Sequence, residues 1–174
     1  MSCTGSSTLM RTWGSRYRGA LLRMTRRDWL TMLAELGRRG HGTIESGAFL
    51  LAEKDGDPTR VTRVIYYDDL DPDCLVGSIH IHGLAYGQLW ALCRTDGLKV
   101  IGDAHTHPAE WVGQSKVDRG SPMVAQKGHV AVIIPHLAQR PTSPNDVGVH
   151  LYDGREWTSW TGAGAAARLL VRRF

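Results

Sequence analysis

Residues 98–118 read LKVIGDAHTHPAEWVGQSKVD, and this stretch decides the fold. Its first half, 98–107, predicts a β-strand, because it holds an apolar run of the kind found in buried strands. Pro108 ends this strand, a short loop follows, and Ser115 begins a short helix. A strand, a return loop and a helix in this order place the first turn of the helix over the end of the strand.

Two histidines and an aspartate in this stretch are candidate metal ligands. His105 and His107 stand two positions apart on the strand, so both imidazoles project to the same face and can reach one ion. Asp118, in the first turn of the helix, can supply a third ligand. The spacing is H-x-H-x(7)-S-x(2)-D. Two nitrogens and one carboxylate, with a fourth position left for water, form an open catalytic zinc site.

Each part of this pattern also has an ordinary structural explanation. A pair of histidines two apart is common, and His80/His82 lacks a serine and an aspartate at the matching spacing, so we interpret that pair as unrelated to a metal site. Ser115 and Asp118 alone form a helix capping box, and Ser115 can cap the helix and also serve a catalytic site. Glu45 alone is a charged residue at the start of a strand. The functional interpretation rests on all these features occurring together.

The rest of the chain alternates between strand and helix patterns. Strands are expected at 45–54, 60–67, 76–82 and 129–135, and as a hairpin of 146–152 with 156–160. Helices are expected at 26–38, 84–94 and 165–170, and a loop at 68–73. The most hydrophobic strand, 129–135, is expected at the centre of the sheet. This order predicts an α/β fold in one domain, with a mixed β-sheet flanked by helices.

The basic residues are concentrated at the two ends of the chain. The 174 residues include 21 Lys and Arg against 17 Asp and Glu, for a net charge of +4. Residues 1–27 hold six arginines and no acid, 168–174 hold three arginines, and the remaining twelve basic and seventeen acidic residues leave 28–167 near −5. Such a distribution indicates basic arms or surface helices rather than a nucleic-acid-binding domain, so a nucleic-acid partner is not expected.

Composition and cysteine usage suggest a globular protein of a reducing compartment. Hydrophobic residues make up 42% and charged residues 22%, which argues against disorder, and no apolar run reaches the ~20 residues of a membrane span. Cys3, Cys74 and Cys93 are odd in number and far apart, so no disulfide framework is expected, and Cys93 is interpreted as a core residue. The Ser- and Arg-rich N-terminus resembles a transit peptide in composition, although a short basic arm explains it as well. We expect a cytoplasmic protein.

The five candidate residues resemble the JAMM motif of the JAB/MPN zinc metalloprotease family. That motif pairs H-x-H-x(7)-S-x(2)-D with an upstream glutamate that opens a strand of the form E-x-G-G-x-L-x-G. Here this segment is ESGAFLLA at 45–52, which matches at Glu45, Gly47 and Leu50 and departs where glycine is common. The segment GDAHTHP at 102–108 is similar to the family's G-D-x-H-[ST]-H-P. The resemblance covers about residues 30–153.

The resemblance implies a cytidine-deaminase-like JAB/MPN fold and a set of roles. The three parts expected are a basic N-terminal arm at 1–24, a JAB/MPN metalloprotease domain at 25–161 and a basic C-terminal helix at 162–174. His105, His107 and Asp118 would hold one Zn²⁺ per chain. Glu45 would act as the general base, and Ser115 would stabilise the oxyanion by its hydroxyl or its backbone N–H. Asp103 is a candidate to support a ligand histidine, or equally an ordinary hydrogen-bonding residue at a strand end.

The family also implies a class of substrate. Its members cleave amide or isopeptide bonds after the C-terminal tail of ubiquitin or ubiquitin-like proteins, and the chain looks most like bacterial stand-alone members. Many of these are encoded beside ubiquitin-like proteins and their activating and conjugating enzymes, including in antiphage defence systems, so such enzymes are further expected partners. Only about ten residues separate Asp118 from the strand at His129, which argues against linkage-specific reading of a ubiquitin chain. Trp111 and the segment 123–125 are expected to flank the cleft, although core packing explains 123–125 equally well.

Two other interpretations stay open at the level of sequence. The first is a non-catalytic JAB/MPN scaffold that binds a ubiquitin-like partner or a conjugation enzyme, as in family members that have lost the motif. The second is a nucleic-acid-associated protein, which only the isoelectric point near 9.2 suggests. The intact set of five residues favours a zinc-dependent peptidase or isopeptidase over both.

Overall fold

A six-stranded mixed sheet forms the centre of the molecule in the computed structural model, which describes residues 19–76 and 79–172. The strand order is β3-β2-β4-β5-β6-β7, and β4 and β5 run parallel while every other neighbouring pair is antiparallel. The strands are β2 (Gly47–Glu53), β3 (Arg63–Tyr66), β4 (Leu98–Thr106), β5 (Val130–Ile134), β6 (Gly148–Tyr152) and β7 (Trp157–Trp160). The expected central strand at 129–135 is therefore confirmed as β5.

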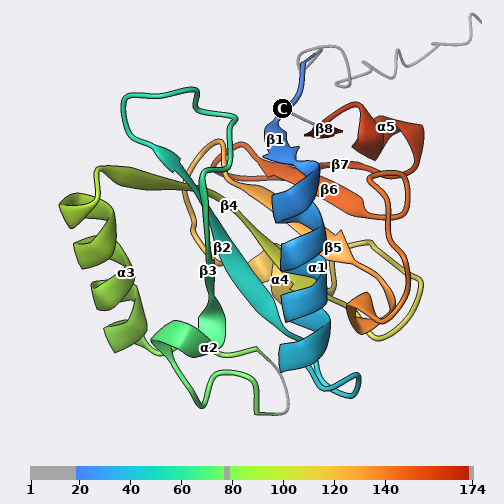
Figure 1. The fold of residues 1–174 in the computed structure, drawn as a ribbon, viewed down its shortest axis with the longest axis horizontal. Coiled ribbons are helices and arrows are strands. Elements are labelled where there is room, and N and C mark those ends of the chain that lie inside the picture. The colour runs from blue at the N-terminus through green and yellow to red at the C-terminus, as the bar shows by residue number, and fades with distance from the viewer. Residues whose placement is uncertain (1–18, 77–78, 173–174) are drawn as a thin grey trace, which may run out of the picture.

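Helix α1 (Arg26–Arg39) covers one face of this sheet (Figure 1). Thr25 caps the helix, because its hydroxyl accepts a hydrogen bond of 3.0 Å from the backbone N–H of Asp28. The apolar face of the helix packs on alternate residues of the strands. The buried cluster they form includes Trp29, Met32, Leu36, Leu50, Ala104, Val132 and Val149. The helix expected at 26–38 is confirmed almost to the residue.

The opposite face of the sheet carries two further helices. The strand residues whose side chains point away from α1 pack there against α3 (Gly83–Thr95) and the short α2 (Tyr67–Leu70). This second cluster includes Phe49, Leu51, Tyr67, Leu89, Cys93 and Val100. Because side chains alternate along a strand, β4 contributes Ala104 to the α1 face and its neighbours 103 and 105 to the opposite face. The expected arrangement, a mixed sheet flanked by helices in one domain, is confirmed.

A second, two-stranded sheet brings the two ends of the described chain together. Strand β1 (Leu22–Thr25) pairs in parallel with β8 (Leu169–Arg172), which follows the short helix α5 (Ala163–Ala166). Leu22 and Leu169 are register partners, and both are buried in the α1 cluster. The two segments that the sequence suggested as terminal arms thus contribute residues to the core.

The structure corrects three local predictions. Residues 68–70 of the expected loop form α2 together with Tyr67, the last residue of the expected strand 60–67, and no strand forms among the described residues of 76–82. The helix expected through 165–170 ends at Ala166, because the chain then pairs with β1 and the apolar residues from 169 onward suit a strand. Residues 1–18 of the expected N-terminal arm and residues 173–174 of the expected C-terminal helix lie outside the described residues.

Two expectations from composition can be compared with the described part of the chain. None of its helices combines the length and the apolar character that crossing a bilayer would need. Cys74 and Cys93 are free and buried, and Cys93 belongs to the core of the α3 face, as the sequence predicted. Cys3 lies outside the described residues.

Candidate metal centre

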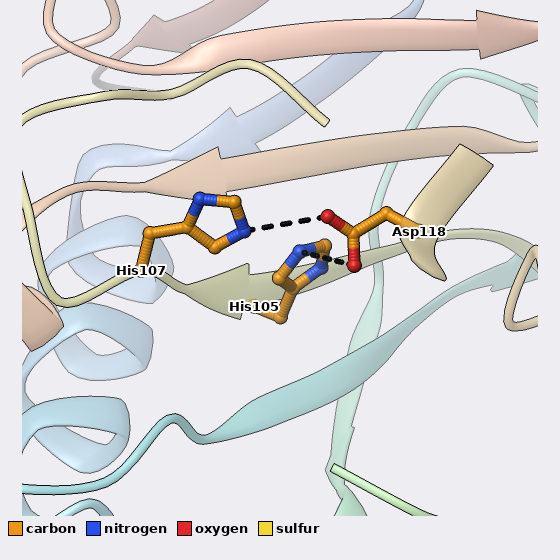
Figure 2. A group of neighbouring side chains, drawn as sticks. All are labelled: His105, His107 and Asp118. Carbon is orange, nitrogen blue, oxygen red and sulfur yellow. Dashed lines mark ion pairs between the residues drawn. The ribbon is translucent and has the colours of Figure 1, made fainter. Parts of the chain in front are cut away.

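His105, His107 and Asp118 converge at the end of β4 (Figure 2). His105 is the penultimate residue of β4 and His107 follows the strand, while Asp118 lies on α4 (Lys116–Gly120). The Nε2 atom of His105 lies 3.8 Å from Oδ1 of Asp118, and Nε2 of His107 lies 3.5 Å from Oδ2 of the same carboxylate. One ligand atom from each residue lies within 4.8 Å of the others, which is close enough for the three to hold one metal ion.

The hydrogen bonds of the two rings leave the Nε2 atoms available to a metal. Nδ1 of His105 lies 3.2 Å from a carboxylate oxygen of Asp103, and Nδ1 of His107 lies 3.3 Å from the carbonyl oxygen of Trp111. Both oxygens can only accept, so each Nδ1 carries the hydrogen and each Nε2 keeps its lone pair. Nε2 of His105 is buried and has no hydrogen-bond partner among the described residues. An orphaned nitrogen facing a second imidazole and a carboxylate fits a zinc site.

Ser115 and Asp118 form the predicted capping box at the start of α4. The backbone N–H of Ser115 donates to Oδ2 of Asp118 at 2.6 Å, and the backbone N–H of Asp118 donates to the Ser115 hydroxyl oxygen at 3.2 Å. The backbone N–H of Ser115 is thereby occupied, and the Ser115 hydroxyl lies beside the same carboxylate. Burial alone raises the pKa of Asp118, but the neighbouring side chains of His107 and His105 and the hydrogen bonds with Ser115 outweigh it and hold that pKa below its usual range.

Glu45 and Ser115 line one pocket together with two of the three candidate ligands. This pocket has a volume of about 420 Å³, and Glu45, His105, Ser115 and Asp118 are among its polar residues. Glu45 stands two residues before Gly47, the partner of His105 across the β2–β4 ladder. The residue between them, Ser46, donates its backbone N–H to the Thr106 hydroxyl at 2.9 Å and accepts from the Thr106 backbone N–H at 2.9 Å. The sheet register therefore brings residue 45 to the same end of β4 as the candidate ligands.

Apolar side chains make up much of the remaining wall of this pocket. Ile79, Ile81, Tyr86 and Met123 line it, and the Tyr86 hydroxyl donates to the Met123 carbonyl oxygen at 2.9 Å. Of the segment 123–125, Met123 therefore faces the pocket, whereas Val124 is buried in the core. Both explanations given for this segment apply, each to a different residue.

The loop after His107 is held by contacts that the sequence did not suggest. Residues 136–138 adopt φ values of 55°, 52° and 55°, a left-handed turn that is unusual without glycine. In this turn the backbone N–H of Leu137 donates to the carbonyl oxygen of His107 at 2.8 Å, and that of His136 donates to Ala109 at 3.1 Å. Further along the loop, Nε2–H of His150 donates to the Val112 carbonyl oxygen at 3.0 Å. The position of His107 thus depends on β5 and β6 as well as on β4.

Trp111 lies against a candidate ligand rather than in the pocket wall. Its indole stacks on the His107 ring, with centroids 5.7 Å apart and an angle of 28° between the planes. The side chain remains 56% exposed. The expectation that Trp111 flanks the site agrees with this placement, although the pocket lining does not include it.

The His80/His82 pair does not form a comparable group. His82 lies 2.6 Å from Asp71 through its Nδ1 atom, and its ring packs edge-on against that of His80. Within residues 19–76 and 79–172, only His105, His107 and Asp118 form a set of three or more ligand residues close enough for one metal ion. His80 instead contributes to the wall of the pocket.

A buried histidine that the sequence did not single out completes the surroundings of His105. His129 directly precedes β5, and its Nε2 atom lies 2.6 Å from Oδ1 of Asp103, whose other oxygen contacts His105. Burial alone raises the pKa of Asp103, and the hydrogen bonds from both histidines outweigh it, so that pKa lies well below its usual range. In the sequence, His129 is marked only by its position as the first residue of the most hydrophobic predicted strand.

Comparison with known proteins shows the fold and leaves the function open. No family model matches the chain. A protein from Desulfitobacterium hafniense is 23% identical, with a TM-score of 0.59 over 88% of this chain and 94% of that chain. A JAB1/MPN domain protein from Archaeoglobus fulgidus is 17% identical with a TM-score of 0.46, over 78% of this chain and 92% of that one. A protein from Salinibacter ruber is 19% identical with a TM-score of 0.49, over 88% and 92%. The first likeness shows a shared fold alone, and the other two are too distant to carry an argument.

Proposed function

We propose that this chain is a zinc-dependent peptidase or isopeptidase of the JAB/MPN type. Its substrate would be the amide bond that follows the C-terminal tail of a ubiquitin-like protein, in precursor processing or deconjugation. The observation that carries the proposal is the convergence of His105, His107 and Asp118 beside a pocket that Glu45 and Ser115 also line. The resemblance of these five residues to the JAMM motif supports the choice of metal and substrate class.

The proposed chemistry assigns a separate task to each group. A zinc ion held by His105, His107 and Asp118 would polarise the scissile carbonyl and acidify the attacking water. The Glu45 carboxylate accepts the proton of that water and returns it to the leaving amine nitrogen. The Ser115 hydroxyl would donate its hydrogen to the developing oxyanion, an interaction typically worth about 3 kcal/mol. The capping box favours the hydroxyl over the backbone N–H for this role, because the backbone N–H of Ser115 already donates to Asp118.

The short connection after α4 bears on the range of substrates. Helix α4 ends at Gly120 and β5 begins at Val130, with Met123 on the pocket wall and Val124 in the core. A segment so short and so closely packed leaves little chain for a separate element that would read the linkage between two modifiers. We therefore propose cleavage directed by the tail of a single ubiquitin-like protein.

The proposal is tested by replacing Glu45 with glutamine. Purified wild-type and E45Q proteins are incubated with ubiquitin-like fusion proteins, with and without a chelator, and zinc is measured by mass spectrometry. We expect about one zinc per chain in both. Cleavage should fall by about 10²- to 10⁴-fold in E45Q, because the proton acceptor is lost while the ligands remain. E110Q is the matched control: Glu110 is an exposed carboxylate in the loop after His107 and does not line the pocket.

Two results would contradict this assignment in different ways. Full cleavage by E45Q would exclude Glu45 as the proton acceptor. Wild-type protein that holds no zinc and cleaves nothing, yet binds a ubiquitin-like protein, would favour the scaffold alternative instead.

A further inference from the structure

Asp103 is a buried carboxylate that contacts two histidines from different parts of the chain. It is 1% exposed and lies on β4, on the same face of the strand as His105. One oxygen lies 3.2 Å from Nδ1 of His105, and the other lies 2.6 Å from Nε2 of His129. Both oxygens are therefore used, and one of them leads directly to a candidate metal ligand.

His129 is itself held firmly in place. It is 3% exposed, its backbone N–H donates to the Gln126 carbonyl oxygen at 3.0 Å, and its own carbonyl oxygen accepts from the Tyr152 backbone N–H at 2.9 Å. Immediately after it, Val130 pairs with Gly102 and Ala131 with Asp103 in the parallel ladder between β5 and β4. The imidazole of His129 is thus fixed relative to Asp103 by the pairing of the two central strands.

The contacts of Asp103 connect His129 to the candidate metal site. A carboxylate oxygen can only accept, so the short contact places a hydrogen on Nε2 of His129 and fixes the orientation of the carboxylate. The other oxygen accepts from Nδ1–H of His105, which leaves the buried Nε2 of His105 facing Asp118 with its lone pair. Apolar residues can often replace a buried ion pair without loss of stability, so stability alone does not explain a carboxylate at this position. Its contact with Nδ1 of His105 indicates a role at the metal site instead.

We propose that His129 is a positioning residue of the metal site, which acts through Asp103 to fix the orientation and tautomer of His105. This inference rests on the metal site of the proposed function but not on peptidase activity. Residues that orient metal ligands in this way typically contribute about 10- to 100-fold to metal affinity.

The test measures Zn²⁺ affinity in the absence of any substrate. Full-length wild-type, H129L, H129N and H129Q proteins are stripped of metal, and affinity is determined by competition with a chromophoric chelator. We expect H129L and H129N to bind Zn²⁺ about 10- to 100-fold more weakly, because leucine offers no donor and asparagine is too short to place one at the position of Nε2. H129Q should bind nearly as tightly as wild type, because its amide nitrogen reaches that position.

The control separates positioning from general stability. Leu169 is buried in the two-stranded sheet, so L169A should destabilise the metal-free protein without changing Zn²⁺ affinity. Urea unfolding of the metal-free proteins identifies any variant that is only partly folded. If H129L fails to fold, the comparison of H129N with H129Q decides the question. With Co²⁺ as the probe, the visible spectrum of H129N should also differ from that of wild type, since coordination geometry would change.

Each outcome bears on the inference. Unchanged Zn²⁺ affinity in H129L and H129N would overturn it, as would equal losses in H129Q and H129N. Wild-type protein that binds no Zn²⁺ would overturn both this inference and the proposed metal site. Wild-type protein that binds Zn²⁺ but cleaves no ubiquitin-like fusion, with weaker binding in H129N, would support the positioning role while the proposed activity fails.

Discussion

Buried histidines have three different environments in this protein. His105 and His107 each turn Nδ1 toward an oxygen acceptor and Nε2 toward Asp118. His129 contacts a carboxylate, whereas His150 lies between a hydroxyl and a carbonyl oxygen, with Nδ1 at 2.8 Å from Ser159 and Nε2 at 3.0 Å from Val112. The residue type alone therefore does not assign the role. Only the partner of each ring nitrogen distinguishes a candidate ligand from a structural histidine.

His150 should make the folded state sensitive to acid. Burial lowers its pKa from 6.5 to about 4 in the folded protein, so between these values the unfolded chain binds a proton that the folded chain excludes. The contribution of neutral His150 to stability is complete above pH 6.5 and is lost as the pH falls toward 4. The shift corresponds to about 3 kcal/mol of unfolding free energy.

The measurement compares wild-type and H150Q proteins by urea unfolding from pH 7 to pH 4. A chelator keeps both free of metal, so that ligand protonation does not enter through metal release. We expect the difference in unfolding free energy between the two proteins to shrink or reverse by about 3 kcal/mol across this range. A difference that stays constant with pH would show that His150 does not contribute to the acid sensitivity.

At the scale of elements, β4 does most to place the site. It carries Asp103 and His105, leads directly into His107, and lies between β2, which Glu45 precedes, and β5, which His129 precedes. The spacing of apolar residues and the length of each apolar segment predicted the three longest elements, α1, α3 and β4, because a strong local pattern determines each of them. Helix α2 and the left-handed turn at 136–138 were not predicted, because packing and distant backbone partners determine them.

The close approach of β4 and β5 requires glycine at position 102. A Cβ atom on Gly102 would lie 2.3 Å from the Val130 carbonyl oxygen, which belongs to the backbone of the neighbouring strand. We expect G102A to lower the free energy of unfolding by about 1–3 kcal/mol, as overpacking typically does, because the two central strands must separate. Thermal or urea unfolding of the purified variant measures this.

Gly87 provides the matched control for this substitution. It lies within α3, and a Cβ atom there would have no neighbour within 4 Å. G87A should therefore stabilise the protein by up to about 1 kcal/mol through helix propensity. Equal effects of G87A and G102A would mean that strand spacing does not explain the glycine at position 102.

At the scale of the whole molecule, the two ends of the described chain complete the core. From the sequence, 1–24 and 162–174 were expected to flank a separate domain at 25–161. Instead, β1 and β8 pair with each other and add Leu22 and Leu169 to the cluster beneath α1. Basic side chains at the ends are compatible with this arrangement, because Arg23 and Arg172 are exposed while Leu22, Met24 and Leu169 are buried.

Leu22 and Leu169 should therefore contribute to stability together. Each is buried at a register-paired position, so L22A and L169A should each lower the free energy of unfolding by about 2–5 kcal/mol. The double variant should lose less than the sum of the two, because the first substitution already removes the shared contact. A double-mutant cycle by urea unfolding tests this. Single variants as stable as wild type would indicate that 25–161 folds independently of its flanking segments.

The sequence by itself determined the features that depend on short separations along the chain. The two histidines two residues apart on a strand, the capping box of Ser115 and Asp118, and the long amphipathic α1 all follow from local periodicity and spacing. The tertiary structure alone decided which groups surround them. The contacts of His129 with Asp103, of His150 with Val112 and of β1 with β8 join residues 26, 38 and more than a hundred positions apart. Such contacts depend on strand order and register, which the cooperative packing of the whole chain determines and no local pattern specifies.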